Sequence, residues 1–178
     1  CGGESIADSE DTIEKLWAHN VRTILDYSAE GQTAEADLDA TCSEVLATIQ
    51  AADGDARHAF AVFKVSGLSS NALLEKVGVA MAGGDALSRE DEEAWMRVQR
   101  RVRTLCEATA AAGGRVMIDA EESWIQDAID SLAEDMMSDY NRDRVVVYNT
   151  VQMYRHDRLA YLKAMVARAE EAGHRCGD

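Results

Sequence analysis

Short runs of β-branched and aromatic residues alternate along this chain with longer segments whose apolar residues recur every three or four positions. The short runs are 21–26, 60–64, 116–119 and 145–151. The longer segments are 8–19, 34–51, 69–79, 89–111, 124–137 and 158–172. The longer spacing is typical of helices with one buried face, and short continuous apolar runs are typical of strands buried on both faces. The pattern therefore predicts one helix followed by four strand–helix units.

Helix-capping residues mark the ends of two of these elements. Ser88 precedes Asp91 by three residues, and this pair resembles a capping box, which predicts that a long helix begins there. Gly173 ends the last helix, because glycine readily takes the left-handed conformation that follows many helices. We interpret residues 1–178 as a single domain in which 83–111 is a helical insertion between the second and third strands.

Polar residues follow each apolar run at its carboxyl end, which bears on the fold class. Asp26, Lys64 and Asp119 close the first three runs, and the polar residues of 149–152 close the fourth. Barrels of the (β/α)8 type build their active sites from these strand ends. A dinucleotide-binding open sheet needs a glycine-rich turn after its first strand, which the segment DYSAEGQ does not supply. We therefore predict an α/β protein with an incomplete (β/α)8 TIM-type barrel of about four βα units.

The charge, the apolar runs and the cysteine spacing of the chain argue against several classes of function. The chain has 33 acidic and 18 basic residues and a formal net charge of −15. This charge disfavours binding to nucleic acid or to an anionic membrane surface, because the long-range field repels polyanions. No apolar run approaches the length of about 18 residues that a membrane-spanning helix needs. The four widely spaced cysteines and four scattered histidines form no metal-ligand pattern, so we expect no metal and reduced thiols.

Three charged residues at predicted strand ends are candidates for chemistry. The ammonium of Lys64 would suit an anionic substrate group such as a carboxylate, or it simply extends from the strand end to water. Asp119 is either a site carboxylate or the N-cap of the next helix. Asp26 is either a third residue of the same site or part of a simple turn.

Two other groups of charged residues are assigned to solvated helix surfaces. Glu121 and Glu122 are placed in the acidic first turn of the helix that follows the third strand, where the helix dipole favours them. The arginines of the long helix have acidic neighbours, so we predict a solvated, salt-bridged face rather than a phosphate site. These arginines are Arg97, Arg100, Arg101 and Arg103.

Five segments of the chain resemble successive blocks of the proline dehydrogenase family, in the order in which the family has them. They are CGGE, VRTILDYSAEG, FAVFKVSG, RVMIDAEESWIQDAID and VVVYNTVQMYRHDRLAYL. The combination of MIDAEES with YNTVQMYRHDRL is specific, whereas CGGE and DYSAEG alone are weak. The resemblance implies a distorted (β/α)8 barrel that binds FAD at the carboxyl ends of its strands. It also implies oxidation of L-proline to Δ1-pyrroline-5-carboxylate, with electrons passed through FAD to a quinone.

The resemblance also implies roles for the strand-end residues. Lys64 takes the place of the lysine that pairs with the proline carboxylate. Asp119 matches the catalytic-site aspartate beneath the substrate, and Asp26 matches an aspartate on the same rim. The segment Asn149-Thr150-Val151-Gln152 matches the strand whose amide side chain contacts the flavin, and the choice between Asn149 and Gln152 stays open.

The chain stops after EEAGHRCGD, where the fifth strand of the family would begin, and it does not start with Met. It therefore looks like an excerpt of a longer protein, and we expect that it neither binds FAD nor turns over alone. The resemblance implies a bacterial cytoplasmic location and leaves peripheral membrane association and oligomerisation of the full enzyme open. Two alternatives remain: a non-catalytic barrel fragment or pairing partner that needs a second chain, and an unrelated barrel for another carboxylate substrate.

Overall fold

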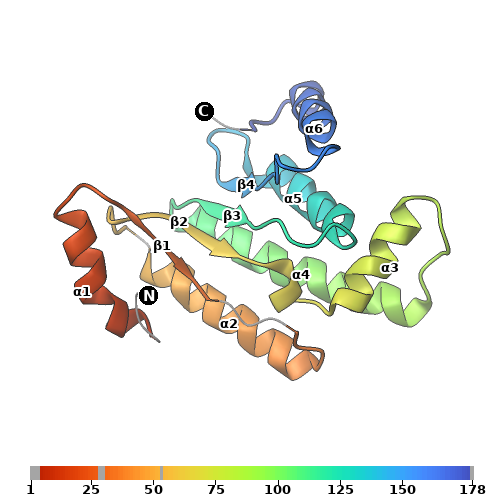
Figure 1. Cartoon of the computed structure of the whole chain (residues 1–178). Coiled ribbons are helices and arrows are strands. Elements are labelled where there is room, and N and C mark those ends of the chain that lie inside the picture. The colour runs from red at the N-terminus through yellow and green to blue at the C-terminus, as the bar shows by residue number, and fades with distance from the viewer. Residues whose placement is uncertain (1–4, 28–30, 53, 177–178) are drawn as a thin grey trace.

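The computed structural model describes residues 5–27, 31–52 and 54–176 (Figure 1). The CGGE block and residues 28–30 of the DYSAEG block lie outside the described residues. Helices and strands alternate in the predicted order, with a short 3-10 turn after the second strand. The elements are α1 (Ile6–Trp17), β1 (Thr23–Asp26), α2 (Glu35–Ala51), β2 (His58–Phe63), the turn Val65–Gly67, α3 (Asn71–Met81), α4 (Arg89–Ala111), β3 (Val116–Ile118), α5 (Gln126–Tyr140), β4 (Val147–Asn149) and α6 (Arg158–Ala172).

The four strands form one parallel sheet in the order β1-β2-β3-β4, so each strand pairs with the next one along the chain. Backbone hydrogen bonds continue past the strand ends. Asp119 N–H donates to Phe63 O at 3.0 Å, and Thr150 N–H donates to Ile118 O at 3.2 Å. Because all strands run in one direction, their carboxyl ends meet at one edge of the sheet. The predicted α/β barrel-type arrangement of strands is confirmed.

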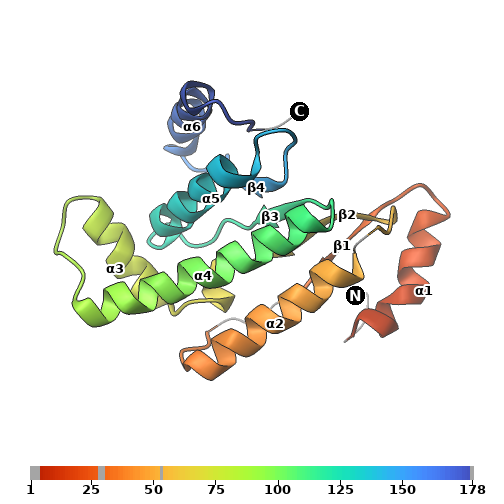
Figure 2. The ribbon, with the colours of Figure 1, turned by 180° about the vertical axis from the view of Figure 1, so that it is seen from behind.

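Helices α2 and α4 lie on the same side of the sheet, and α5 and α6 lie beside β4 (Figures 1 and 2). The side chains of Phe63, Val116 and Ile118 point to the helix side and have no exposed surface. The alternate residues Val62 and Met117 are only half-buried. Among the described residues the helices thus cover one face of the sheet, whereas the sequence pattern predicted burial on both faces.

Helix α4 confirms the predicted start of the long helix. The Ser88 hydroxyl accepts the Asp91 N–H at 3.1 Å, which satisfies one of the free N–H groups of the first turn. Gly173 follows α6 and has the left-handed conformation predicted for it, with φ of +70°. None of the helices in the described ranges is both long and apolar enough to cross a membrane.

The prediction of a solvated, salt-bridged arginine face on α4 is right about the ion pairs of Arg101 but wrong about its solvation, because its side chain is 7% exposed. Its guanidinium pairs with Glu35 and Asp39 of α2, and it donates to Leu68 O at 3.1 Å. Charged partners from α2 and a main-chain carbonyl offset the cost of burying this group. Arg101 therefore ties α2 and α4 to the segment that follows the turn after β2.

Replacing Leu105, a fully buried residue of α4, should test whether this helix is part of the main core. Leu105→Ala is expected to lower the free energy of unfolding by about 2–5 kcal/mol, because it leaves a cavity among packed side chains. Met96→Ala on the same helix is the matched control, since Met96 is 54% exposed. Denaturant unfolding measures both variants, and equal effects would contradict this placement of α4.

Candidate active site

The segment after β2 presents Lys64 at the carboxyl edge of the sheet. Lys64 begins the turn Val65–Gly67, in which Gly67 N–H donates to Lys64 O at 3.2 Å and Leu68 N–H to Val65 O at 2.9 Å. Val65 and Leu68 have no exposed surface and anchor the turn in the core. Burial of Val65 and Leu68 therefore fixes the backbone at Lys64 against the core.

The segment after β3 brings Asp119 into contact with the end of β4. Asp119 Oδ1 accepts the Ala120 N–H and the Thr150 hydroxyl, each at 3.1 Å. The Thr150 oxygen in turn accepts the Ala120 N–H at 2.6 Å. Helix α5 begins only at Gln126 and has no side-chain cap, so Asp119 does not cap it. This excludes the simple capping interpretation and leaves Asp119 in a fixed polar cluster at the strand ends.

Glu121 lies in the loop before α5 and not in a helical first turn, so the sequence assignment of this residue is wrong. Its side chain is 9% exposed and accepts two hydrogen bonds from Ser66, one from the N–H at 3.1 Å and one from the hydroxyl. Burial raises the pKa of the Glu121 carboxyl, while the Ser66 donors and the charge of Lys64 act in the opposite direction. Glu122 lies in the same loop, so its placement in the helical first turn is also wrong, but it is exposed, as expected of a solvated acid. No local pattern separates these adjacent acids, because the distinguishing partner is 55 residues away.

Asn149 and Gln152 project in different directions, which bears on the alternative left open by the sequence. Asn149 Nδ2 donates to Asp130 of α5 at 3.0 Å and to the Tyr161 hydroxyl of α6 at 2.9 Å. Its side chain therefore lies between the sheet and the helices. Gln152 instead donates to Glu121 O at 3.0 Å and lines an open cleft at the strand ends.

The cleft has a volume of about 680 Å³ and lies at the carboxyl ends of β2, β3 and β4. Its lining residues are Lys64, 120–123, Gln152 and 154–157. Of the candidate residues, Lys64 and Gln152 line this cleft, and the Asp119–Thr150 pair is bonded to Ala120 on its wall. Asp26 lines a separate hollow between α1, β1 and α2 instead. The structure thus brings most of the candidates together, but not Asp26 or Asn149.

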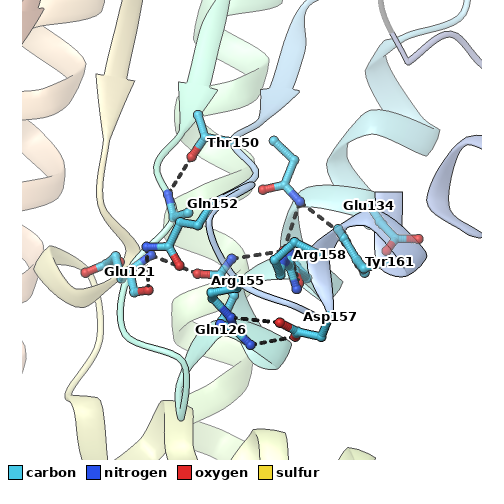
Figure 3. A network of polar contacts seen from close by, with 12 residues as sticks. Glu121, Gln126, Glu134, Thr150, Gln152, Arg155, Asp157, Arg158 and Tyr161 are labelled. Carbon is cyan, nitrogen blue, oxygen red and sulfur yellow. Dashed lines mark hydrogen bonds and ion pairs between the residues drawn. The ribbon is translucent and has the colours of Figure 1, made fainter. Parts of the chain in front are cut away.

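A buried polar network behind β4 fixes the helices that support the cleft (Figure 3). Asp130 accepts hydrogen bonds from Gln126 at 2.9 Å, from Asn149 at 3.0 Å and from Arg158 at 2.7 Å. The Arg158 guanidinium also lies 3.9 Å from the centroid of the Tyr161 ring. Gln126 extends this network to the cleft, because its amide oxygen accepts the Glu121 N–H at 2.8 Å.

The fold and the cleft define an α/β barrel-type protein whose candidate site lies at the carboxyl ends of parallel strands. The sequence profile of the proline dehydrogenase family matches residues 9–177, and the chain belongs to that family. It is 32% identical over 168 residues to the carbapenem antibiotics biosynthesis protein CarD of Pectobacterium carotovorum, covering 94% of this chain and 44% of that protein. It is 24% identical to the mitochondrial proline dehydrogenase 1 of Dictyostelium discoideum, covering 92% of this chain and 34% of that protein.

Solved structures share the fold. The chain superposes on proline utilization A (PutA) from Bdellovibrio bacteriovorus inactivated by N-propargylglycine with a TM-score of 0.75 and 14% sequence identity. The match covers 97% of this chain and 18% of that one. Together with the CarD and Dictyostelium matches, this shows that the chain spans less than half the length of these relatives.

The Asp130–Arg158 pair should contribute much more to stability than its neighbour Glu134–Arg168, which also joins α5 to α6. The first pair has side chains 5% and 3% exposed, and the second has side chains 25% and 52% exposed. Asp130→Ala is expected to cost about 3–5 kcal/mol, because it leaves the Arg158 charge buried without its carboxylate. Glu134→Ala should cost at most about 1 kcal/mol. Denaturant unfolding of both variants measures the difference, and a reversed order would contradict the burial described here.

Proposed function

We propose that this chain carries part of the active site of a flavin-dependent enzyme that oxidises L-proline to Δ1-pyrroline-5-carboxylate. The observation that carries the proposal is the convergence of Lys64 and Gln152 on one cleft with Asp119 fixed at its wall. Family membership supports the reaction class. The polar groups come from three different strand ends, as is typical of barrel active sites.

Lys64 is proposed to bind the carboxylate of the substrate. Lys64 and Arg155 line the cleft beside His156, and three carboxylates, Glu121, Glu122 and Asp157, line it as well. Arg155 is paired with Asp157 at 2.7 Å, so Lys64 is the basic residue proposed to meet the substrate. A charged hydrogen bond between an ammonium and a carboxylate is about twice as strong as a neutral one.

Asp119 is proposed to orient the substrate through the polar cluster that it forms with Thr150. The Thr150 hydroxyl and the Ala120 N–H together hold Asp119 Oδ1, so this carboxylate has a fixed orientation before substrate arrives. Removal of hydrogen from a carbon atom depends strongly on the position of that atom, and a preformed site lowers the entropic cost of positioning. Asp26 is proposed to act only at the outer rim, since it lines a different hollow.

FAD is the proposed cofactor, and it would supply the two-electron acceptor for this oxidation before a quinone takes the electrons. Lys64 and Arg155 line the cleft together with three carboxylates. Arg155 Nη1 is buried without a hydrogen-bond partner among the described residues, which makes it the donor proposed to meet an oxygen of the cofactor. Gln152 and Thr150 are the residues proposed to lie against the flavin. Asn149 is a weaker candidate, because its amide nitrogen donates hydrogen bonds to Asp130 of α5 and Tyr161 of α6. We place this chemistry in the bacterial cytoplasm.

A second candidate function is a step in antibiotic biosynthesis rather than in proline breakdown. The observation that favours it is the similarity to CarD, whose name assigns it to carbapenem antibiotic biosynthesis, over 94% of this chain. Comparing kcat/KM for L-proline with that for ring-substituted prolines tests it, and a preference for a substrate other than L-proline favours this second function.

Lys64→Ala is expected to raise the KM for L-proline by about ten-fold to a hundred-fold with a small change in kcat, because the lost contact binds substrate and transition state alike. The assay follows bleaching of the flavin absorbance by L-proline, using this segment joined to the remaining barrel length that its relatives have. Lys76→Ala is the matched control, since Lys76 pairs with Asp91 at 2.7 Å, away from the cleft. An unchanged KM for Lys64→Ala would overturn the carboxylate role.

A further inference from the structure

We propose that Glu121 is a positioning residue that fixes the Lys64 ammonium in the cleft by holding the turn after β2. It acts through Ser66, and the consequence for substrate binding rests on the proposed function. The geometry of the loops at the strand ends carries this inference, since Glu121 contacts the segments that follow three different strands.

The side chain of Glu121 accepts two hydrogen bonds from Ser66. Oε1 accepts the Ser66 N–H at 3.1 Å, and Oε2 accepts the Ser66 hydroxyl. Both residues are buried, so each donor would otherwise lack a water partner. Hydrogen bonds to an ionised acceptor are stronger than those between neutral groups. The two contacts therefore fix both the backbone and the side chain at the middle of the turn.

The turn determines where Lys64 lies. Lys64 is the residue directly before Val65–Gly67, and its carbonyl accepts the Gly67 N–H. Val65 anchors the turn by burial, and the Glu121 carboxylate holds it from the side of the next strand. Loss of the carboxylate would remove both hydrogen bonds to Ser66. The turn, and with it the backbone at Lys64, would then unfold locally more often.

Glu121 is itself held by its main chain. Its N–H donates to Gln126 at 2.8 Å, and its carbonyl accepts from Gln152 at 3.0 Å. Gln126 in turn donates to the buried Asp130 at 2.9 Å. Glu121 therefore links the buried network behind β4 to the turn that follows Lys64 through a continuous series of hydrogen bonds.

The adjacent acids provide matched variants. Glu121→Gln removes the charge and weakens the grip on Ser66, Ser66→Ala removes the hydroxyl while leaving the charge, and Glu122→Gln removes an exposed charge from the same loop. Each variant is made in this chain, and its circular dichroism spectrum is compared with that of the parent. If Glu121→Gln does not fold, Ser66→Ala decides the test.

The direct readout is the acetylation rate of Lys64 relative to Lys76, measured by mass spectrometry with acetic anhydride as the probe. Glu121→Gln and Ser66→Ala are both expected to raise this ratio by about three-fold or more, because the turn opens more often. Glu122→Gln should leave the ratio unchanged. An unchanged ratio in Ser66→Ala overturns the positioning role, and an equal rise in Glu122→Gln shows that charge alone is responsible.

The second readout is catalytic and uses the flavin-loaded protein in which this segment is joined to the remaining barrel length that its relatives have. Glu121→Gln is expected to raise the KM for L-proline by about ten-fold, with kcat changed much less. A fall in kcat at constant KM would overturn the proposal. If proline is not oxidised at all while the acetylation ratios change as expected, the proposed function fails and the control of Lys64 by Glu121 stands.

Discussion

Parallel pairing of consecutive strands is the constraint from which the arrangement of the site follows. Each ladder aligns the carboxyl end of one strand with that of the next, and the hydrogen bonds of Asp119 and Thr150 continue the ladders beyond the strands. Residues that are distant in sequence, such as Lys64 and Gln152, therefore reach one cleft without long loops. Where pairing places a strand end further along the sheet, as for Asp26, the residue reaches a different hollow.

Features determined by neighbouring residues were predictable from the sequence. The order of helices and strands follows from apolar spacing, and the Ser88 cap and the Gly173 end follow from residue types within one turn. Glu121 and Arg101 were misassigned for the opposite reason. Their burial depends on Ser66 and on the acids of α2, which are 55 to 66 residues away in sequence. Composition near each residue contains no information about such partners.

The orientations of Asn149, the last residue of β4, and of Gln152, three residues beyond it, were likewise not predictable from the sequence. Successive side chains of a strand point to opposite faces, so an error of one residue moves a side chain from the cleft to the helices. Pattern alone could not choose between Asn149 and Gln152. The orientation depends on Asp130 and Tyr161, which give Asn149 a hydrogen-bond partner on each adjoining helix.

The strand order has a consequence for how such a protein can be divided and rebuilt. Because β1 to β4 pair only with neighbours in sequence, a boundary placed between two βα units interrupts a single ladder and leaves the others whole. The paired residues nevertheless lie 31 to 55 positions apart in sequence, so each unit joins its predecessor only after a loop of that length has closed. Such modularity makes the sheet suited to growth by duplication and to reassembly from separately produced pieces.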